Sequence, residues 1–159
     1  MRYPRGAGPG VAVDSTMQTL PIGKAEIRRE GRRVALLAFG SMVAPAQEAG
    51  EAFKATVINM RFVKPLDQEL ILKLARSHEL LITIEENAIA GGAGSAVNEC
   101  LAAAGLMTRV IINLGLPDRF LEHGNHQQQL SHCGLDAAGI RRTILRYAPV
   151  EPAVKLETA

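Results

Sequence analysis

The sequence contains no tryptophan, aromatic residues make up only 4% of its 159 residues, and there are two cysteines. A core with so few aromatic side chains must be aliphatic and rich in alanine, which favours packed α/β layers over a β-sandwich. Cys100 and Cys133 do not have the C-x-x-C spacing of a redox or zinc site. The sequence shows no signal-peptide pattern and no apolar run near the roughly 20 residues of a transmembrane helix. We therefore expect a cytoplasmic protein with no membrane partner.

The formal net charge is +2, which is too small to attract nucleic acid over a long range. The basic side chains are unevenly distributed, because residues 1–33 carry seven of them against three acidic ones. No aromatic side chain that could stack on a base stands within residues 28–33, where four of the arginines lie. We interpret this cluster as a solvated edge hairpin and expect no nucleic-acid partner.

Apolar segments predict five strands, and helical patterns separate most of them. The strands are expected at residues 22–29, 34–39, 56–60, 80–84 and 110–114, and the helices at 42–53, 67–76, 95–104 and 137–147. Asp67 and Asp136 are the expected N-caps of two helices. Strands joined through helices lie parallel, whereas the short break at residues 30–31 predicts an antiparallel pairing of the first two strands. The fold class is therefore α/β: a three-layer domain with about five strands, mostly parallel, one antiparallel edge strand, and helices on both faces.

A glycine loop with Gly91, Gly92 and Gly94 opens one of these helices and invites a phosphate-binding interpretation. The full G-x-G-x-x-G pattern is absent, and Glu85 and Glu86 at the preceding strand end would repel a phosphate. We favour a structural role, in which the glycines allow a sharp turn and close helix packing. The two glutamates would then bond the helix N-terminus or a partner surface. Ser41 and Ser95 are interpreted as helix caps.

Three histidines and Cys133 fall close together near the C-terminus, with enough ligand types for zinc. No two of them have a strong zinc spacing, so we expect no metal site. A role for His123 in lining a site stays an open alternative. His126 and His132 are interpreted as exposed loop residues. His78 is expected at a helix end, facing the negative end of the dipole.

The segment RYPRG at residues 2–6 holds Arg5 in a set direction, because proline stiffens the chain and glycine allows an unusual turn. A fixed guanidinium suits two-pronged binding of a phosphate or carboxylate. An ordinary linker with incidental charge explains these residues equally well on the sequence alone.

Six sequence blocks occur in order along the chain: RYPRG at 2–6, LPIGKA at 20–25, MRFVKPLD at 60–67, TIEENAIAGGAGSAVNE at 83–99, GLPDRFLEHG at 115–124 and GLDAAGI at 134–140. Together they resemble the C-terminal domain of the 1-deoxy-D-xylulose-5-phosphate synthase family, which are transketolase-like enzymes that use thiamine diphosphate. The resemblance covers about residues 2–147. Two departures are peripheral: Ala25 stands where the family often has glycine, and Cys133 where an acidic residue is common.

The resemblance implies an enzyme that condenses pyruvate with glyceraldehyde 3-phosphate, with loss of carbon dioxide. The product would feed non-mevalonate isoprenoid synthesis and the synthesis of thiamine and pyridoxal. Arg5 matches the arginine with which the family holds the substrate phosphate. The chain has no GDG…Asn motif, with which the family binds magnesium and diphosphate. We therefore expect thiamine diphosphate and magnesium to be bound by domains absent here, and no catalytic, cofactor-binding or metal-binding residue in this chain.

The implied organisation is a linker segment from the preceding domain at residues 1–19, a transketolase C-terminal-like domain at 20–148 and a flexible tail at 149–159. Such an excised domain should be inactive alone and should support a homodimer. Two alternatives stay open: a partner-docking C-terminal domain of a two-subunit oxo-acid dehydrogenase, and a stand-alone nucleotide-binding module that uses the glycine loop.

Overall fold

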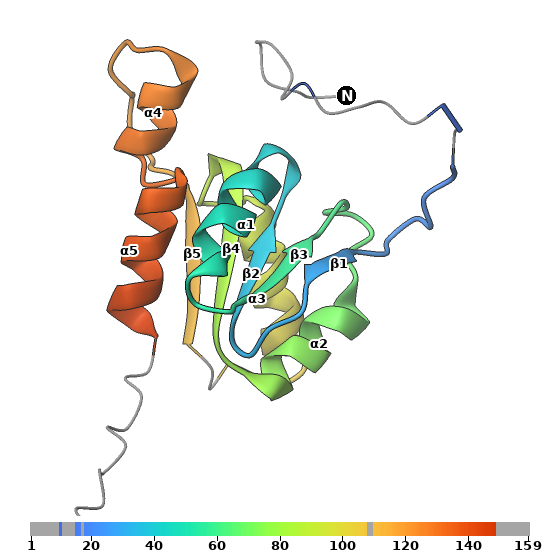
Figure 1. Cartoon of the computed structure of the whole chain (residues 1–159). Coiled ribbons are helices and arrows are strands. Elements are labelled where there is room, and N and C mark those ends of the chain that lie inside the picture. The colour runs from blue at the N-terminus through green and yellow to red at the C-terminus, as the bar shows by residue number, and fades with distance from the viewer. Residues whose placement is uncertain (1–9, 11–14, 17, 108–109, 149–159) are drawn as a thin grey trace, which may run out of the picture.

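The computed structural model describes residues 10, 15–16, 18–107 and 110–148. Within these residues, a five-stranded sheet lies between two layers of helices (Figure 1). In chain order the elements are β1 (Glu26–Arg29), β2 (Arg33–Ala38), the 3-10 turn η1 (Gly40–Met42), α1 (Val43–Glu51), β3 (Thr56–Asn59), α2 (Gln68–Ser77), β4 (His78–Ala88), α3 (Ala93–Ala103), β5 (Val110–Leu116), α4 (His126–His132) and α5 (Ala137–Tyr147).

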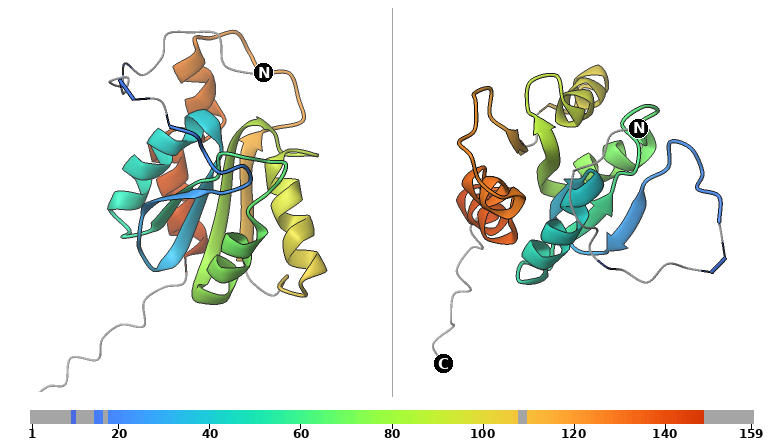
Figure 2. Two further views of the ribbon diagram at one scale, coloured as in Figure 1. Left: turned by 90° about the vertical axis from the view of Figure 1, so that its right-hand side faces the viewer. Right: turned by 90° about the horizontal axis from the view of Figure 1, so that it is seen from above.

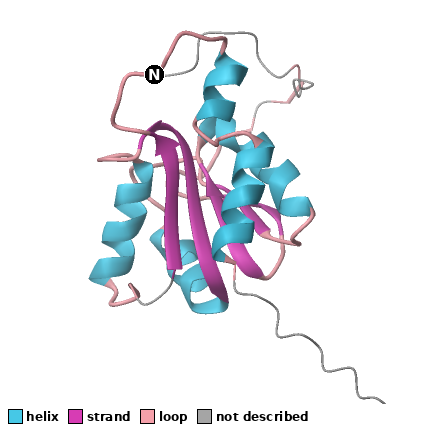
Figure 3. Ribbon diagram, turned by 90° about the vertical axis from the view of Figure 1, so that its left-hand side faces the viewer, coloured by secondary structure: helices cyan, strands magenta, loops and turns pink. Residues whose placement is uncertain are grey.

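The strand order across the sheet is β1-β3-β2-β4-β5, and every pairing is parallel except that of β1 with β3. The predicted fold class is therefore confirmed. Helices α1 and α5 cover one face of the sheet, and α2 and α3 cover the other, as the view from above shows (Figure 2). The chain crosses from β2 to its neighbour β3 through α1, from β3 past β2 to β4 through α2, and from β4 to its neighbour β5 through α3. These helices lie on both sides of the strands in Figure 3.

Strand β2 is the centre of the hydrophobic core. Val34 and Leu36 pack with residues of α1 and α5, whereas Ala35 and Leu37 pack with residues of α2 and α3. Alternate side chains of a strand point to opposite faces, so an apolar residue is needed at every position when both faces are covered. The uninterrupted apolar run of this strand thus reflects its two-sided burial.

The predicted hairpin between the first two strands is wrong, because β1 pairs with β3 instead of β2. Both edges of β2 are already occupied by the parallel strands β3 and β4. The short connection at residues 30–32 runs across the start of β3: the Gly31 N–H donates to Thr56 Oγ1 (3.1 Å), and the Arg32 N–H donates to the Lys54 carbonyl (3.2 Å). A side chain at Gly31 would collide with the Lys54 carbonyl oxygen. The break is therefore a crossing over β3 and not a hairpin turn.

Helix α4 is a difference from the sequence-based expectation, which places His126 and His132 in a loop. None of its residues is buried, so it has no apolar period to reveal it. A capping box begins it: Asn125 accepts from the Gln128 N–H, and the Gln128 side chain accepts from the Asn125 N–H. That Asn-x-x-Gln spacing is the local signal that could have identified the helix.

Strand β4 also continues four residues beyond the predicted end, to Ala88.

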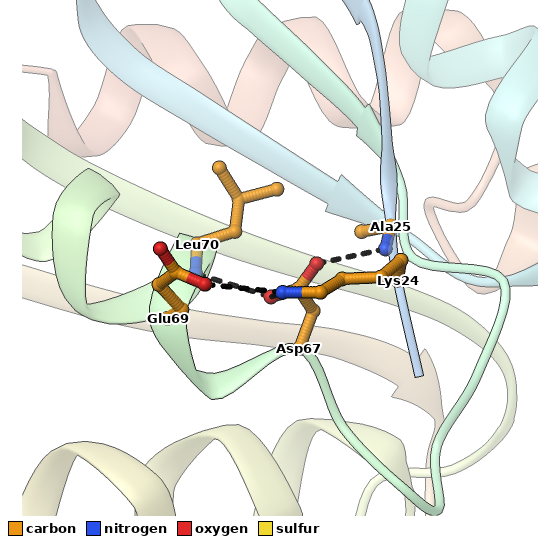
Figure 4. Close-up of polar contacts among 5 residues, drawn as sticks. All are labelled: Lys24, Ala25, Asp67, Glu69 and Leu70. Atoms are coloured by element: carbon orange, nitrogen blue, oxygen red, sulfur yellow. Dashed lines mark hydrogen bonds and ion pairs between the residues drawn. The ribbon is translucent and has the colours of Figure 1, made fainter. Parts of the chain in front are cut away.

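Asp67 joins the entry of β1 to the start of α2, as Figure 4 shows. The expected N-cap role is confirmed, since Oδ1 accepts from the Leu70 N–H (3.3 Å). The other oxygen accepts from the Ala25 N–H (2.9 Å), and Lys24 Nζ lies 3.8 Å from Oδ1. Asp67 is only 6% exposed, and its loss leaves two partly buried N–H donors without partners.

We predict that Asp67→Ala lowers the free energy of unfolding by about 2–3 kcal/mol, because it removes a helix cap and leaves the Ala25 N–H unpaired. Urea denaturation of the purified chain measures this. Glu69→Ala is the matched control, since Glu69 is an exposed partner of Lys24 and should contribute less than about 1 kcal/mol. Equal effects of the two substitutions would contradict the bracing role of Asp67.

His78 occupies the end of α2, as expected, but it is buried and also begins β4. Its Nδ1 lies 3.3 Å from the Leu74 carbonyl, and its Nε2 lies 2.7 Å from Thr56 Oγ1. Ser77 Oγ also lies 2.9 Å from Nδ1. With the proton on Nδ1, the ring donates to the Leu74 carbonyl and Nε2 accepts from the threonine hydroxyl. Burial lowers the pKa of His78, so the neutral ring is the folded form.

This lowered pKa predicts a pH dependence of stability. The unfolded chain binds a proton at His78 more readily than the folded chain does, so His78 stabilises the fold above its unfolded pKa of about 6.5. That contribution falls as the pH falls below this value. The measurement compares the wild type with His78→Gln by urea denaturation from pH 8 to pH 5. A difference in unfolding free energy that stays constant over this range would contradict the prediction.

Candidate functional site

The connections of the sheet diverge at the carboxyl ends of β2 and β4. From β2 the chain crosses through α1 to β3 on one side, whereas from β4 it crosses through α3 to β5 on the other. Open α/β sheets bind ligands at such a switch point. A hollow of about 640 Å³ lies there, lined by the residues that follow β2, the end of β4, the glycine loop and the first turns of α3.

Glu85 closes one wall of this hollow. The carboxylate is 3% exposed and accepts from the N–H groups of Ala93 (2.7 Å) and Gly94 (2.8 Å) in the first turn of α3. These N–H groups are the donors that a bound phosphate would need at a helix N-terminus. The interpretation in which a glutamate bonds the helix N-terminus is therefore confirmed. The carboxylate takes the place that the nucleotide-binding alternative assigns to a phosphate.

The glycines let α3 approach β4 and β5 closely. A Cβ at Gly92 would collide with the Ala88 carbonyl oxygen, and a Cβ at Gly94 would lie 2.6 Å from Thr83 Oγ1. The structural role predicted for the loop is confirmed. The residue that caps α3 is Gly92, so the predicted capping role of Ser95 is wrong, and the Ser95 hydroxyl donates to the Ile89 carbonyl instead.

Glu86 joins three segments that are distant in the sequence. Its Oε2 accepts from the Ser41 hydroxyl (2.7 Å), and its Oε1 lies 2.6 Å from His126 Nε2. The predicted capping role of Ser41 is therefore wrong. Its hydroxyl ties the turn after β2 to β4 instead. His126 begins α4 and is not a loop residue. Because the carboxylate stands between serine and histidine, this arrangement fastens α4 to the sheet and does not activate the serine as a nucleophile.

The histidines do not converge on a metal site. His123 and His132 line a second hollow of about 300 Å³ beside α4, and His126 faces Glu86. Across the part of the chain that the structure describes, no three His, Cys, Asp or Glu side chains gather to hold a metal ion. The interpretation of His132 as a loop residue is also wrong, since it ends α4.

Arg5, the predicted substrate-binding residue, lies outside the described residues, as do most of the linker at 1–19 and the tail at 149–159. The structure leaves the predicted role of Arg5 untested. No helix among the described residues is long and apolar enough to cross a bilayer.

We predict that Gly94→Ala destabilises the fold by about 1–3 kcal/mol, because the new methyl group overlaps Thr83 and Asn113. Thermal or urea unfolding of the purified chain measures the change. Gly124→Ala is the matched control: its methyl group would lie 3.4 Å from the nearest atom, and the expected change stays within about 0.5 kcal/mol. Tolerance of alanine at Gly94 would show that α3 does not depend on this close approach.

Comparison with known proteins identifies the domain type. The family described as "Transketolase, C-terminal domain" matches residues 23–140. Among solved structures, a split-gene transketolase in an inactive beta4 tetramer matches with a TM-score of 0.73 and 31% identity, over 80% of this chain and 43% of that chain.

Curated relatives share the sequence over nearly all of its length. The 1-deoxy-D-xylulose-5-phosphate synthase of Nitrosococcus oceani is 56% identical over 98% of this chain. The synthase of Methylobacillus flagellatus is 62% identical over 88% of it. The chain spans about a quarter of the length of these relatives, 24% and 23% respectively. The chain therefore belongs to the transketolase C-terminal domain family and is similar to the 1-deoxy-D-xylulose-5-phosphate synthases within it.

Proposed function

We propose that the chain is the C-terminal domain of an enzyme that condenses pyruvate with glyceraldehyde 3-phosphate to 1-deoxy-D-xylulose 5-phosphate, releasing carbon dioxide. The observation that carries this proposal is the 56–62% identity to synthases that bear this product's name, over 88–98% of the chain. The enzyme would be a cytoplasmic homodimer, and its product a precursor of isoprenoids, thiamine and pyridoxal.

The described residues do not fit the diphosphate of thiamine diphosphate, and no three of their His, Cys, Asp or Glu side chains gather to hold a metal ion. The hollow at the switch point is lined by the carboxylates Glu85, Glu86 and Glu99, and no lysine or arginine is among its described lining residues. Negative side chains without a cation repel a diphosphate. Glu85 also occupies the helix N–H groups that could hold one. We therefore propose that the cofactor and its metal ion bind elsewhere in the synthase, which leaves this domain inactive alone.

The role proposed for this domain in the reaction rests on Arg5. A guanidinium forms two parallel charge-assisted hydrogen bonds with a phosphate, which fixes both position and orientation. Glyceraldehyde 3-phosphate carries the phosphate, and pyruvate carries none. The proposed contribution is therefore selective binding of one of the two substrates, together with support of the dimer.

We predict that Arg5→Ala in the complete synthase raises the KM for glyceraldehyde 3-phosphate roughly ten- to hundredfold, the effect of losing charge-assisted hydrogen bonds worth about 1.5–3 kcal/mol. The KM for pyruvate should change far less. Steady-state kinetics with each substrate varied in turn separate the two constants. Arg32→Ala is the control, because Arg32 is exposed in the turn before β2.

The kinetics distinguish two failures. If the unmodified synthase forms no 1-deoxy-D-xylulose 5-phosphate, the proposed function is wrong. If it forms the product but Arg5→Ala raises both Michaelis constants equally, the function stands and Arg5 does not bind the phosphate.

A further inference from the structure

Strand β5 leaves one side of the sheet open. It forms the margin of the sheet opposite β1 (Figure 1), and among the described residues its backbone pairs only with β4. We call the unpaired side of Val110–Leu116 the outer edge. We propose that the outer edges of two copies of this chain pair antiparallel, which joins both sheets into one. The proposal stands apart from the proposed function, because it is argued from this strand and not from the reaction.

The composition of β5 does not protect it against pairing with another strand. Its seven residues, VIINLGL, include no charged side chain and no proline. The pairing with β4 is regular from Val110 to Leu114, and the register shift beyond it inserts residues into β4 and not into β5. A long, regular, apolar strand presents a row of N–H and C=O groups to any second strand. The outer edge is therefore suited to main-chain pairing.

The other margin of the sheet is protected. Strand β1 has only four residues, three of which are charged, and Arg28 and Arg61 both pair with Glu26 (3.1 and 2.8 Å). Short strands and charged side chains are the features with which proteins prevent edge-to-edge pairing. The contrast within one sheet indicates that a partner covers the outer edge and not β1.

The residues that follow α5 are not suited to cover the outer edge. Helix α5 runs alongside β5 (Figure 1), so a strand formed after it would run parallel to β5. That connection would use the face that α1 also covers, but it would cross the sheet in the opposite direction. It would therefore have the opposite hand to the connection from β2 through α1 to β3, whereas nearly all such connections share one hand. Pro149 and Pro152 also lack the N–H that pairing requires.

A second copy of the chain fits the outer edge. Asn113 is the midpoint of β5, so an antiparallel pairing about a twofold axis at Asn113 places all seven residues opposite residues of the copy. Ile112 then lies opposite Leu114, and Val110 opposite Leu116. Side chains in opposite positions project from the same face of a sheet and pack together. No like charges meet, because the strand carries none.

Exposed apolar side chains at both ends of β5 support an antiparallel partner. Met107 (52% exposed) and Val110 (46%) lie at its start, and Phe120 (104%) follows its end. In the proposed pairing, the start of one strand lies beside the end of the other. The two groups of exposed side chains are thus brought together at each end of the pairing, where removing apolar surface from water is favourable.

Sedimentation equilibrium of the purified chain tests the self-association. At about 100 µM the wild type is expected to sediment as a dimer of the 17.0 kDa chain. Val110→Lys introduces a charge opposite Leu116 of the copy and should raise the dissociation constant at least about tenfold. Phe120→Lys is a second variant that leaves the fold intact, because Phe120 is fully exposed. Ile22→Lys is the matched control, since Ile22 is 77% exposed and precedes β1 at the far margin.

Photo-crosslinking identifies the surface at which the copies meet. Chains that carry p-benzoylphenylalanine in place of Phe120 are mixed in unlabelled and isotopically labelled form, so that crosslinks between two copies are recognised by mass. The expected crosslink joins position 120 of one copy to a peptide of the other that contains Met107 or Val110.

A wild-type chain that stays monomeric would overturn the proposal. Equal weakening of the dimer by Ile22→Lys and Val110→Lys would overturn it too, as would crosslinks between copies that lead to residues 20–29. Circular dichroism shows whether each variant is folded. If Val110→Lys does not fold, Phe120→Lys and the crosslink decide the outcome. None of these measurements depends on product formation, so failure of the proposed function is recognised separately.

Discussion

The burial of β2 on both faces and along both edges is the constraint on which the rest of the structure depends. Helices cover its two faces, and β3 and β4 occupy its two edges. Because β3 and β4 pair with both edges of β2, β1 joins the sheet at a margin, where it pairs with β3. The same central position of β2 makes the connections diverge at its carboxyl end, which places the hollow between β2 and β4.

Glu85 determines the chemistry of that hollow. In many α/β domains the helix N-terminus at a switch point is left open for an anionic ligand. Here a carboxylate of the chain itself neutralises the helix dipole and satisfies two N–H groups. The site therefore stabilises the domain where related topologies bind phosphates.

Two acidic side chains connect the loops at the carboxyl ends of the parallel strands. Asp67 links the segment entering β1 to α2, and Glu86 links the turn after β2 to α4. Each connects segments that are at least 40 residues apart, so these loops are held together by long-range polar contacts while the core below them is aliphatic.

The amino-acid sequence by itself determined those features that depend on neighbouring residues. Asp67 and Asp136 cap helices because an acceptor lies next to the free N–H groups, and the apolar run of β2 indicates a strand buried on both faces. The three-layer class follows from the order of strands and helices.

Only the tertiary structure decided which strands pair and which polar groups meet. The pairing of β1 with β3 results from competition for the edges of β2, which no short segment encodes. The contacts of Glu85 with α3 and of Glu86 with His126 depend on where the crossovers bring these residues. Helix α4 lacked an apolar face because the domain buries none of its residues. Local pattern therefore specified the elements, and backbone pairing across the whole sheet specified the site.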